Sequence, residues 1–455
     1  MHVNLGCPVL ATKRKQPKQI SADAAAKLVC SGDWLDFGFG NNQPDVFDKA
    51  LAERIDELCD VKIRAGMALK PRAVLETDPE GKCFHWFSWH FSGYDRAKHV
   101  EDLCHYIPFH LGEVPDYYRR FLAPVDVAVL KVRVPDADGY CNLGPCHLWH
   151  RALVEQAKIL ILEISTSVPD VCGIDNAIHV SEADYIIAGD NAPMVEVLHD
   201  PVCEADRAVA RQIAGEVEDG ACLQIGIGSM PNAVCSMLKE TGAKDLGIHT
   251  ELMTDGLFEL YKKGIVTGAR KQTDPGKSAY TLGIGAQSLY DGLTANPDML
   301  CCAPDYTNLP HNIMRNDKVL SINNTTQMDL QGQAASETSG FRHLSGTGGQ
   351  AQFVRGAYAS KGGKSFMCLS SVYERKGIRK SRIVLNFAPG DIVTTLRTDV
   401  MYVVTEYGMV NLKGKSVPER AHAMISLAHP DFREDLERQA YEHGLLPRHL
   451  HLAPV

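Results

Sequence analysis

Short apolar runs alternate along this chain with segments whose apolar residues recur at helical spacing. The runs are rich in β-branched residues and have few polar interruptions, which is typical of strands buried on both faces of a sheet. These strand-like runs are residues 127–134, 159–164, 185–188, 382–387 and 401–405. Helix-like segments lie among them, at residues 24–28, 45–58, 204–218, 233–239, 257–263 and 433–443. This alternation predicts an α/β fold with mostly parallel sheets covered by helices.

Two parts of the chain share one local pattern. Residues 32–51 and 220–238 both read as a glycine, a short strand, Gly-apolar-Gly, a polar turn, a proline and an amphipathic helix ending in leucine. Each copy would place its glycine-rich turn at the carboxyl end of a strand, the edge where open α/β sheets bind ligands. We therefore expect two similar α/β domains, 1–198 and 199–455, that arose by duplication, with residues 190–205 as the linker. Chance similarity of two short turns is the alternative.

Length, composition and charge narrow the class of protein. A chain of 455 residues with 45% apolar and 23% charged residues is long enough for two or three domains with real cores. The formal net charge of −9 argues against a general nucleic-acid binder, because a phosphate backbone requires concentrated Lys and Arg. The chain also lacks a signal-peptide core and any apolar run close to the ~20 residues that span a bilayer. We expect a cytoplasmic protein with no membrane or nucleic-acid partner.

The cysteines do not predict disulfides or a metal site. All 14 are scattered, and no Cys-x-x-Cys occurs. Reduced and mostly buried thiols are the expectation for a cytosolic protein. The pair His449 and His451 is interpreted as a surface feature, so no metal is expected.

The most informative stretch is 220–234, together with 247–257. A strand-like run breaks at Gly226-Ile227-Gly228 and enters a helix through Pro231, which leaves free backbone N–H groups at a helix start. A second short strand then delivers a carboxylate, Glu251, about two dozen residues later. Amide donors for an oxyanion beside a carboxylate suit acyl transfer through a covalent acyl-glutamate.

Several further motifs occur with this stretch in a fixed order along the chain. They are Gly226-Ile-Gly228-x-x-Pro231, His249-Thr-Glu251-x-x-x-Asp255-Gly256, Asn323 with Asp329 and Gln333, Gly346-Thr-Gly-Gly349-Gln-x-x-Phe353, Val404-Thr-Glu406-Tyr-Gly408, Leu412-x-Gly414-Lys415-Ser416 and Ala428-His-Pro-Asp-Phe-Arg433. Together, from about Ala22 to Ala440, they resemble the acetyl-CoA hydrolase/transferase family, and in particular its 4-hydroxybutyrate CoA-transferase branch. Butyryl-CoA:acetate and itaconate CoA-transferases are close possibilities within the same resemblance.

The resemblance implies a double displacement that uses coenzyme A as a substrate and no tightly bound cofactor. Glu251 would attack the thioester carbonyl of an acyl-CoA to form a mixed anhydride. The freed CoA thiolate would then attack the glutamyl carbonyl and give an enzyme–CoA thioester, which a second carboxylic acid opens in reverse. The partners implied are an acyl-CoA and a short-chain carboxylic acid, and the assembly implied is a homodimer or homotetramer.

The resemblance also assigns roles to residues of this chain. Glu251 matches the nucleophile, and Ile227 and Gly349 match the amide donors to the oxyanion. Glu406 matches a carboxylate that moves between contacts as CoA binds. The residues implied to bind CoA are Gly226, Gly228, Gly346, Gly348, Phe353, Glu406 and Asn308.

Each of these residues also has a purely structural interpretation. Glu251 alone could be a surface carboxylate at a strand end, and Gly226 with Gly228 a plain strand-to-helix turn. Gly346–Gly349 could be a flexible linker, and Glu406 an ion-pair partner of Lys413 or Arg420. The polar residues Asn323, Asn324, Asp329 and Gln333 could simply cap turns. Residues 331–349 are predicted to form a mobile loop over the site.

Other function classes remain to be weighed against CoA transfer. The same glutamate would make a thioesterase if water reached the acyl-enzyme, and an α/β fold could also serve as a non-catalytic metabolite sensor. An ATP-dependent ligase is disfavoured, because Tyr358 and Lys271 stand where the two phosphate-loop-like stretches need their leading glycine. A dehydrogenase is disfavoured because Gly38-Phe-Gly40 lacks the third glycine of the dinucleotide fingerprint.

The acid-binding pocket has only candidate segments at this level. The N-terminal half offers the aromatic and cationic residues of 84–90 and 106–110, together with Lys131 and Arg133. A dicarboxylate substrate would favour an Arg among them, because a bidentate pair fits its distal carboxylate.

Overall fold

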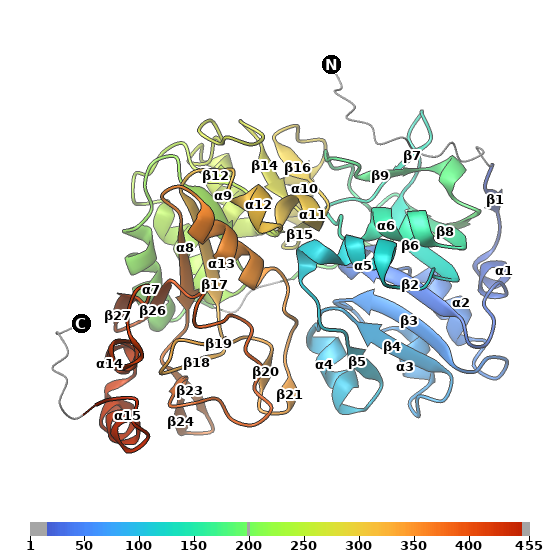
Figure 1. Ribbon diagram of the computed structural model, residues 1–455. Coiled ribbons are helices and arrows are strands. Elements are labelled where there is room, and N and C mark those ends of the chain that lie inside the picture. Colours follow the sequence, from blue (N-terminus) through green and yellow to red (C-terminus); the bar gives the residue numbers. More distant parts are fainter. Residues whose placement is uncertain (1–15, 198–200, 448–455) are drawn as a thin grey trace.

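The computed structural model describes residues 16–197 and 201–447, which form two main sheets, mostly parallel and flanked by helices (Figure 1). In this view the first sheet and its helices, coloured blue to teal, lie on the right, and the second half of the chain, coloured green to red, lies on the left. The predicted α/β class with mostly parallel sheets is confirmed.

The first sheet has eight strands in the order β1-β10-β8-β6-β2-β3-β4-β5, and every neighbouring pair is parallel. Its strands are β1 (Lys18–Gln19), β2 (Trp34–Phe39), β3 (Val61–Gly66), β4 (Phe84–Ser88), β5 (Cys104–Tyr106), β6 (Val127–Arg133), β8 (Ile159–Ser165) and β10 (Tyr185–Ala188). The accompanying helices are α1 (Ala22–Ala26), α2 (Val46–Ala52), α3 (Ala73–Thr77), α4 (Gly93–Val100), α5 (Val114–Arg120) and α6 (His150–Gln156).

The second sheet has six strands in the order β12-β11-β17-β22-β26-β27, parallel except for the last pair. Its strands are β11 (Cys222–Ile225), β12 (Gly247–Ile248), β17 (Val319–Asn324), β22 (Lys364–Cys368), β26 (Tyr402–Thr405) and β27 (Gly408–Asn411). The accompanying helices are α7 (Glu204–Ala214), α8 (Ser229–Leu238), α9 (Asp255–Lys262), α10 (Gln287–Leu293), α11 (Pro304–Thr307), α12 (Pro310–Ile313), α13 (Gln350–Ala359), α14 (Val417–Leu427) and α15 (Pro430–Glu442).

Short strands outside the two sheets shape the loops around them. They pair as β7 (Tyr140–Asn142) with β9 (Ala177–His179), β13 (Leu252–Met253) with β15 (Leu282–Gly283), β14 (Ser278–Tyr280) with β16 (Met299–Cys301), β20 (Thr338–Ser339) with β21 (Arg342–His343), and β23 (Val372–Arg375) with β24 (Ile378–Ser381). A further three-stranded sheet joins β18 (Gln327–Asp329) to β19 (Ala334–Ala335) and β25 (Ile383–Val384).

The two sheets repeat one topology, as the shared sequence pattern predicts. Five strands of the first sheet, β3-β2-β6-β8-β10, and five of the second, β12-β11-β17-β22-β26, stand in the same order relative to the chain, with the first strand second in space. The register agrees as well: Leu35 pairs through Val127 with Ile159, and Leu223 pairs through Leu320 with Lys364. Residue-by-residue equivalence follows from these ladders, and it places Gly226-Ile227-Gly228 at the position of Gly38-Phe39-Gly40.

Several predicted elements differ from the structure. The helix predicted over 45–58 ends at Ala52, because the amides of Arg54 and Ile55 bond to carbonyls three residues back and tighten the chain into turns. The run 382–387 forms only the two-residue strand β25, outside both main sheets, because its partner β18 is a short strand that follows a turn. The segment 331–349 is not simply a loop, since it contains β19, β20 and β21; its mobility stays a prediction.

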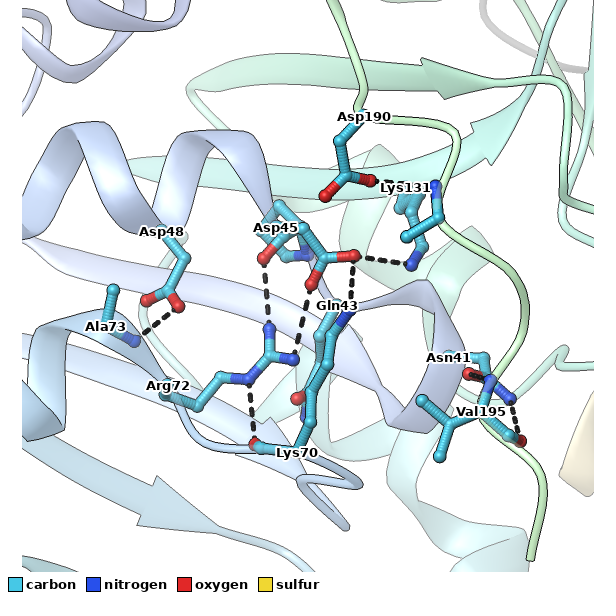
Figure 2. Close-up of polar contacts among 12 residues, drawn as sticks. Asn41, Gln43, Asp45, Asp48, Lys70, Arg72, Ala73, Lys131, Asp190 and Val195 are labelled. Atoms are coloured by element: carbon cyan, nitrogen blue, oxygen red, sulfur yellow. Dashed lines mark hydrogen bonds and ion pairs between the residues drawn. The ribbon is translucent and has the colours of Figure 1, made fainter.

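The predicted linker 190–205 has no regular element before α7 begins at Glu204, and its residues 198–200 lie outside the described residues. Val195 ties it to the first half through two hydrogen bonds with the Asn41 side chain (Figure 2). Most of the described cysteines are buried, and all of them are free thiols. His449 and His451 lie outside the described residues.

Candidate active site

The glycine turn after β11 is built as the sequence predicts. The Gly226 amide donates to the Ile322 carbonyl at 3.0 Å, which continues the ladder, and the turn then leaves the sheet. Gly228 precedes α8 with a φ of 127°, a conformation that L side chains rarely adopt. Within residues 16–197 and 201–447 the Ile227 amide between them has no hydrogen-bond acceptor. This turn therefore offers a free N–H group at the edge of the sheet.

Glu251 lies between β12 and β13 and lines the same cavity as Gly226 and Ile227 of this turn. Its backbone carbonyl accepts hydrogen bonds from the amides of Thr281 and Leu282, at 3.1 and 2.9 Å, which fix the main chain at this point. Burial raises the pKa of the Glu251 carboxyl to about 7, although hydrogen bonds from Asn308 and the Gly349 backbone favour the ionised form. A carboxylate that ionises near neutral pH and has lost most of its hydration is a competent nucleophile.

Asn308 holds the carboxyl group in place. Its Nδ2 donates to Glu251 Oε2 at 2.6 Å, while its Oδ1 accepts from the Thr307 hydroxyl at 2.8 Å. The side chain is fully buried at the end of α11. Because the hydroxyl donor occupies Oδ1, the amide presents its N–H group to Glu251.

The second glycine turn, Gly346–Gly349, directly precedes α13 and contacts the same carboxyl group. A Cβ at Gly349 would lie 2.1 Å from Asn308 Nδ2 and 2.2 Å from Glu251 Oε2, so only glycine fits there. A Cβ at Gly348 would lie 3.5 Å from Glu251 Oε1. The turn therefore brings its backbone within direct contact of Glu251.

Glu251 opens into a cavity of about 230 Å³ that both halves of the chain enclose. The second half contributes both glycine turns, Gln224, Asn323 and Asn324, and Phe353 from the buried face of α13. The first half contributes Phe39, Met67, His90, Phe109, Leu111 and Leu148. Among the described residues that line the cavity, Glu251 is the only carboxylate, and no Lys or Arg is present.

Three of the residues predicted to bind CoA lie outside this lining. Gly228 shapes the turn without lining the cavity, and Asn308 acts through Glu251. Glu406 follows β26 and accepts hydrogen bonds from the Ser371 amide and hydroxyl, at 2.8 and 2.6 Å. In the described structure neither Lys413 nor Arg420 bonds to Glu406; the hydrogen bonds that their side chains donate go to backbone carbonyls.

The turn-capping interpretation fits some of the polar residues and not others. Asp329 accepts from the amides of Gln331 and Gln333, as a turn cap does. Asn323 instead lies within β17 and exchanges hydrogen bonds with Gln224 across the sheet.

The segments proposed for the acid pocket contribute only in part. His90 and Phe109 line the cavity, whereas Lys131 is buried in an ion pair with Asp45 and Arg133 donates to the Val168 carbonyl. Sequence reasoning missed Met67 and Leu148. Phe39 could have been found, because the repeat places it at the position of Ile227.

Two further searches of the described residues gave negative results. No helix there has both the length and the apolar character needed to cross a bilayer. No group of three or more His, Cys, Asp or Glu side chains there is arranged to hold a metal ion.

Comparison with known proteins shows the family to which the chain is similar. Residues 11–198 match the acetyl-CoA hydrolase/transferase N-terminal domain, and residues 285–440 match the C-terminal domain of the same family. A butyryl-CoA:acetate CoA-transferase from Anaerostipes caccae is 42% identical over 428 residues, which cover 93% of this chain and 96% of that protein.

Solved structures extend the comparison. The crystal structure of RipA from Yersinia pestis is 35% identical, with a TM-score of 0.86 over 94% of this chain and 98% of that one. A 4-hydroxybutyrate CoA-transferase from Porphyromonas gingivalis is 34% identical, with a TM-score of 0.76 over 93% of this chain and 97% of that one. The chain therefore belongs to the acetyl-CoA hydrolase/transferase family.

Proposed function

We propose that this protein is a CoA-transferase that moves CoA between an acyl-CoA and a short-chain aliphatic monocarboxylate, with Glu251 as the nucleophile. The observation that carries the proposal is the position of the Glu251 carboxyl. It lies against the second glycine turn, in a cavity that the first glycine turn also lines and whose walls come from both halves of the chain. The names of the similar proteins, which include butyryl-CoA:acetate and 4-hydroxybutyrate CoA-transferases, support this reaction class.

The proposed reaction begins when a Glu251 oxygen adds to the thioester carbonyl. The resulting oxyanion receives hydrogen bonds from the Ile227 and Gly349 amides, and its collapse breaks the C–S bond and releases CoA thiolate. The thiolate then adds to the glutamyl carbonyl of the anhydride, which expels the first carboxylate and leaves a glutamyl-CoA thioester. The acceptor carboxylate opens this thioester by the same steps in reverse, so no external oxidant or energy source is needed.

The lining of the cavity favours a monocarboxylate. Apolar side chains dominate the part contributed by the first half of the chain, and no cation is available there to pair with a second carboxylate. Burying an unpaired charge is costly, so succinate or itaconate would bind poorly in this cavity. A dicarboxylate acceptor is therefore the less favoured candidate.

The two halves of the chain have different proposed tasks. Domain 1–198 forms the acid-substrate side, and domain 199–455 carries the nucleophile and binds CoA through Gly226, Gly228, Gly346, Gly348, Phe353, Glu406 and Asn308. Glu406 would exchange its Ser371 contacts for others as CoA arrives. A cytoplasmic homodimer or homotetramer remains part of the proposal, and light scattering of the purified protein tests the assembly.

The test is to trap the enzyme–CoA thioester. Protein incubated with butyryl-CoA is reduced with borohydride, and the modified residue is located by peptide mass spectrometry. We expect modification at Glu251 in the wild type and none in Glu251→Gln. Modification elsewhere, or unimpaired transfer by the variant, would contradict the proposal. CoA release that is equally fast without an acceptor acid would identify a thioesterase, and binding without turnover would identify a sensor.

A further inference from the structure

The second glycine turn belongs to the second half of the chain but is held by the first half. The strands β20 and β21, which precede the turn, lie beside β5 at the edge of the first sheet (Figure 1). The His343 ring of β21 packs on the Tyr106 ring of β5 with a centroid separation of 3.9 Å. Arg96 Nη1 donates to the Leu344 carbonyl at 2.8 Å. The position of the turn therefore depends on the packing of one half against the other.

The three glycines of the turn do not fix its conformation by themselves. Gly348 has a φ of +56°, and neither it nor Gly346 or Gly349 has a side chain that could pack against its surroundings. Glycine loses more conformational freedom on folding than any other residue, so contacts from outside must hold such a turn. The direction of the Gly349 N–H group, the proposed oxyanion donor, depends on those contacts.

Two hydrogen bonds from the first half hold two peptide units of the turn. The Leu111 amide donates to the Gly348 carbonyl at 3.1 Å. That carbonyl and the Gly349 N–H belong to one planar peptide unit, so this contact sets the direction of the N–H group. The Tyr106 hydroxyl oxygen accepts a hydrogen bond from the Thr347 amide at 2.9 Å, which holds the peptide unit that ends at Thr347. Of the two contacts, only the one from Tyr106 is made by a side chain and can be removed by substitution.

A buried carboxylate orients the Tyr106 hydroxyl. Glu337 is only 5% exposed, and its Oε2 accepts hydrogen bonds from the hydroxyls of Thr347 at 2.9 Å and of Tyr106 at 3.4 Å. Because Tyr106 donates its one hydrogen to Glu337, its oxygen is left to accept from the Thr347 amide. Burial raises the pKa of Tyr106 to about 12, so the hydroxyl is protonated at neutral pH. Neither Tyr106 nor Glu337 is among the described residues that line the cavity.

We propose that Tyr106 is a positioning residue for the CoA-transfer reaction. By holding the Thr347 amide, it fixes the turn so that the Gly349 N–H points at the oxyanion that forms when Glu251 attacks the thioester. Tyr106 touches neither substrate and acts from the first half of the chain on a group of the second. The first half thus contributes to the chemical step as well as to the binding of the acid. This inference rests on the proposed CoA transfer through Glu251.

The test follows one half-reaction. Full-length protein is mixed with butyryl-CoA over a range of concentrations, and formation of the glutamyl-CoA thioester is followed by rapid quenching and intact-protein mass spectrometry. In Tyr106→Phe the ring is kept, whereas the Thr347 amide loses its acceptor. We expect the maximum rate to fall about tenfold and the half-saturating concentration to stay within about twofold of the wild type. Glu337→Ala should lower the same rate, because it removes the group that orients the Tyr106 hydroxyl.

The pH dependence separates positioning from a general effect on the fold. The hydrogen bond from the Gly349 backbone lowers the pKa of Glu251, against the larger effect of burial. If the turn moves away, this contact is lost and the pKa of Glu251 rises further. The acid limb of the maximum rate should therefore shift to higher pH in Tyr106→Phe. A substitution that only loosens the fold elsewhere would not shift it.

A matched control comes from the same half of the chain. The Tyr117 hydroxyl donates to Glu113 at 2.9 Å, and in the described structure it bonds to no residue of the second half. Tyr117→Phe should therefore match the wild type in rate and in pH profile. An unchanged maximum rate or an unshifted acid limb in Tyr106→Phe would overturn the inference, as would an equal loss in Tyr117→Phe or a loss that appears only in the half-saturating concentration. Wild-type protein that forms no glutamyl-CoA thioester would instead overturn the proposed function.

Discussion

The glycine turn of the first sheet and that of the second occupy the same place in a repeated fold, yet their surroundings differ. Gly38-Phe39-Gly40 and Gly226-Ile227-Gly228 both follow the first strand of the repeated topology. Phe39 and Ile227 even line the same cavity. The two turns differ in the side chains that pack against the start of the helix that follows each of them.

Charged side chains pack against the start of α2, the helix that follows the first turn. The Glu163 carboxylate accepts hydrogen bonds from the amides of Asp45, Val46 and Phe47 at the start of α2, at 2.8, 3.1 and 3.0 Å. Asp45 in turn pairs with Lys131 at 2.9 Å, and Lys70 and Arg72 also converge on it (Figure 2). The positive end of this helix is thereby neutralised internally.

The second turn lacks these charges. The strand ladders place Cys368 at the position of Glu163 and Asn324 at the position of Lys131. A small thiol cannot reach back to the helix amides as a glutamate does, and Asn324 instead lines the cavity with a buried Oδ1 that has no partner in the described structure. The repeated fold therefore holds a carboxylate beside the helix that follows the first turn and a cysteine at the equivalent strand position in the second half.

The largest effect should come from adding a side chain to the turn Gly346–Gly349. Gly349→Ala would drive a methyl group into Asn308 and Glu251 and displace the amide donor, so kcat/KM should fall by about a hundredfold to a thousandfold. Steady-state kinetics on folded protein measures this. Gly215→Ala is the control, because its new methyl group would meet only a carbonyl at 3.4 Å outside the cavity. Near-normal turnover by Gly349→Ala would show that this turn is not part of the site.

The next largest effect should be the pH dependence of the reaction, which reports the ionisation of Glu251. In the proposed reaction Glu251 must be ionised to attack, and its pKa is raised to about 7, so kcat/KM for the acyl-CoA should fall about fiftyfold from pH 7 to pH 5. Circular dichroism at both values verifies that the fold is intact. A flat profile would mean that the carboxyl is not desolvated during the reaction.

At Glu163, which contacts the start of α2, we expect a substitution to affect the stability of the fold and not the rate of the reaction. Glu163→Gln replaces an acceptor for several amides with a group that also donates, so unfolding should become easier by about 2–4 kcal/mol. Urea denaturation followed by tryptophan fluorescence measures this, with Cys368→Ala as the counterpart that should cost about 1 kcal/mol. A large loss of kcat/KM in correctly folded Glu163→Gln would mean that the first turn has a catalytic part after all.

Much of the fold was predictable because buried parallel strands have a strong sequence signal. The strands β6, β8, β10 and β26 appear at the predicted runs, and the repeat of a strand, a glycine turn and a helix predicted the duplicated topology. The run 382–387 has the same apolar character but belongs to a small separate sheet, because pairing partners are a long-range property. Local pattern alone does not specify them.

The sequence predicted the polar and glycine residues of the candidate site, but it did not predict most of the apolar residues that line the cavity. Glu251 and the second glycine turn, which both belong to the ordered motifs, are in contact, and the first turn lines the same cavity. Asn308 lies outside those motifs, and its contact with Glu251 is seen only in the structure. Lys131 was a reasonable candidate for the acid pocket, yet it is committed to Asp45, a contact between residues far apart in the sequence. Met67 and Leu148 carry no motif, and only the packing of one half against the other brings them to the cavity.

A smaller effect should appear when the equivalent glycines are compared directly. Gly38→Ala forces a methyl group within 2.8 Å of Leu130 Cδ2 at a φ of +69°, whereas the methyl of Gly226→Ala meets nothing closer than 3.7 Å. We expect a loss of about 1–3 kcal/mol for Gly38→Ala and less than about 0.5 kcal/mol for Gly226→Ala. Thermal unfolding of the two variants side by side measures the difference. Equal losses would mean that the two turns are equally packed.

The smallest effect is a gain in stability when Glu251 is replaced by an uncharged residue. The pKa of Glu251 is raised from 4.5 to about 7, so the folded state binds this proton more tightly than the unfolded state. Stability from this group is fully present below pH 4.5 and is lost as pH rises to about 7. Glu251→Gln removes that loss and should be more stable than wild type by about 1–2 kcal/mol at pH 8, and by little at pH 4.5. Urea midpoints at both pH values measure this. A Glu251→Gln protein that is less stable than wild type at pH 8 would mean that the ionised Glu251 carboxylate stabilises the fold.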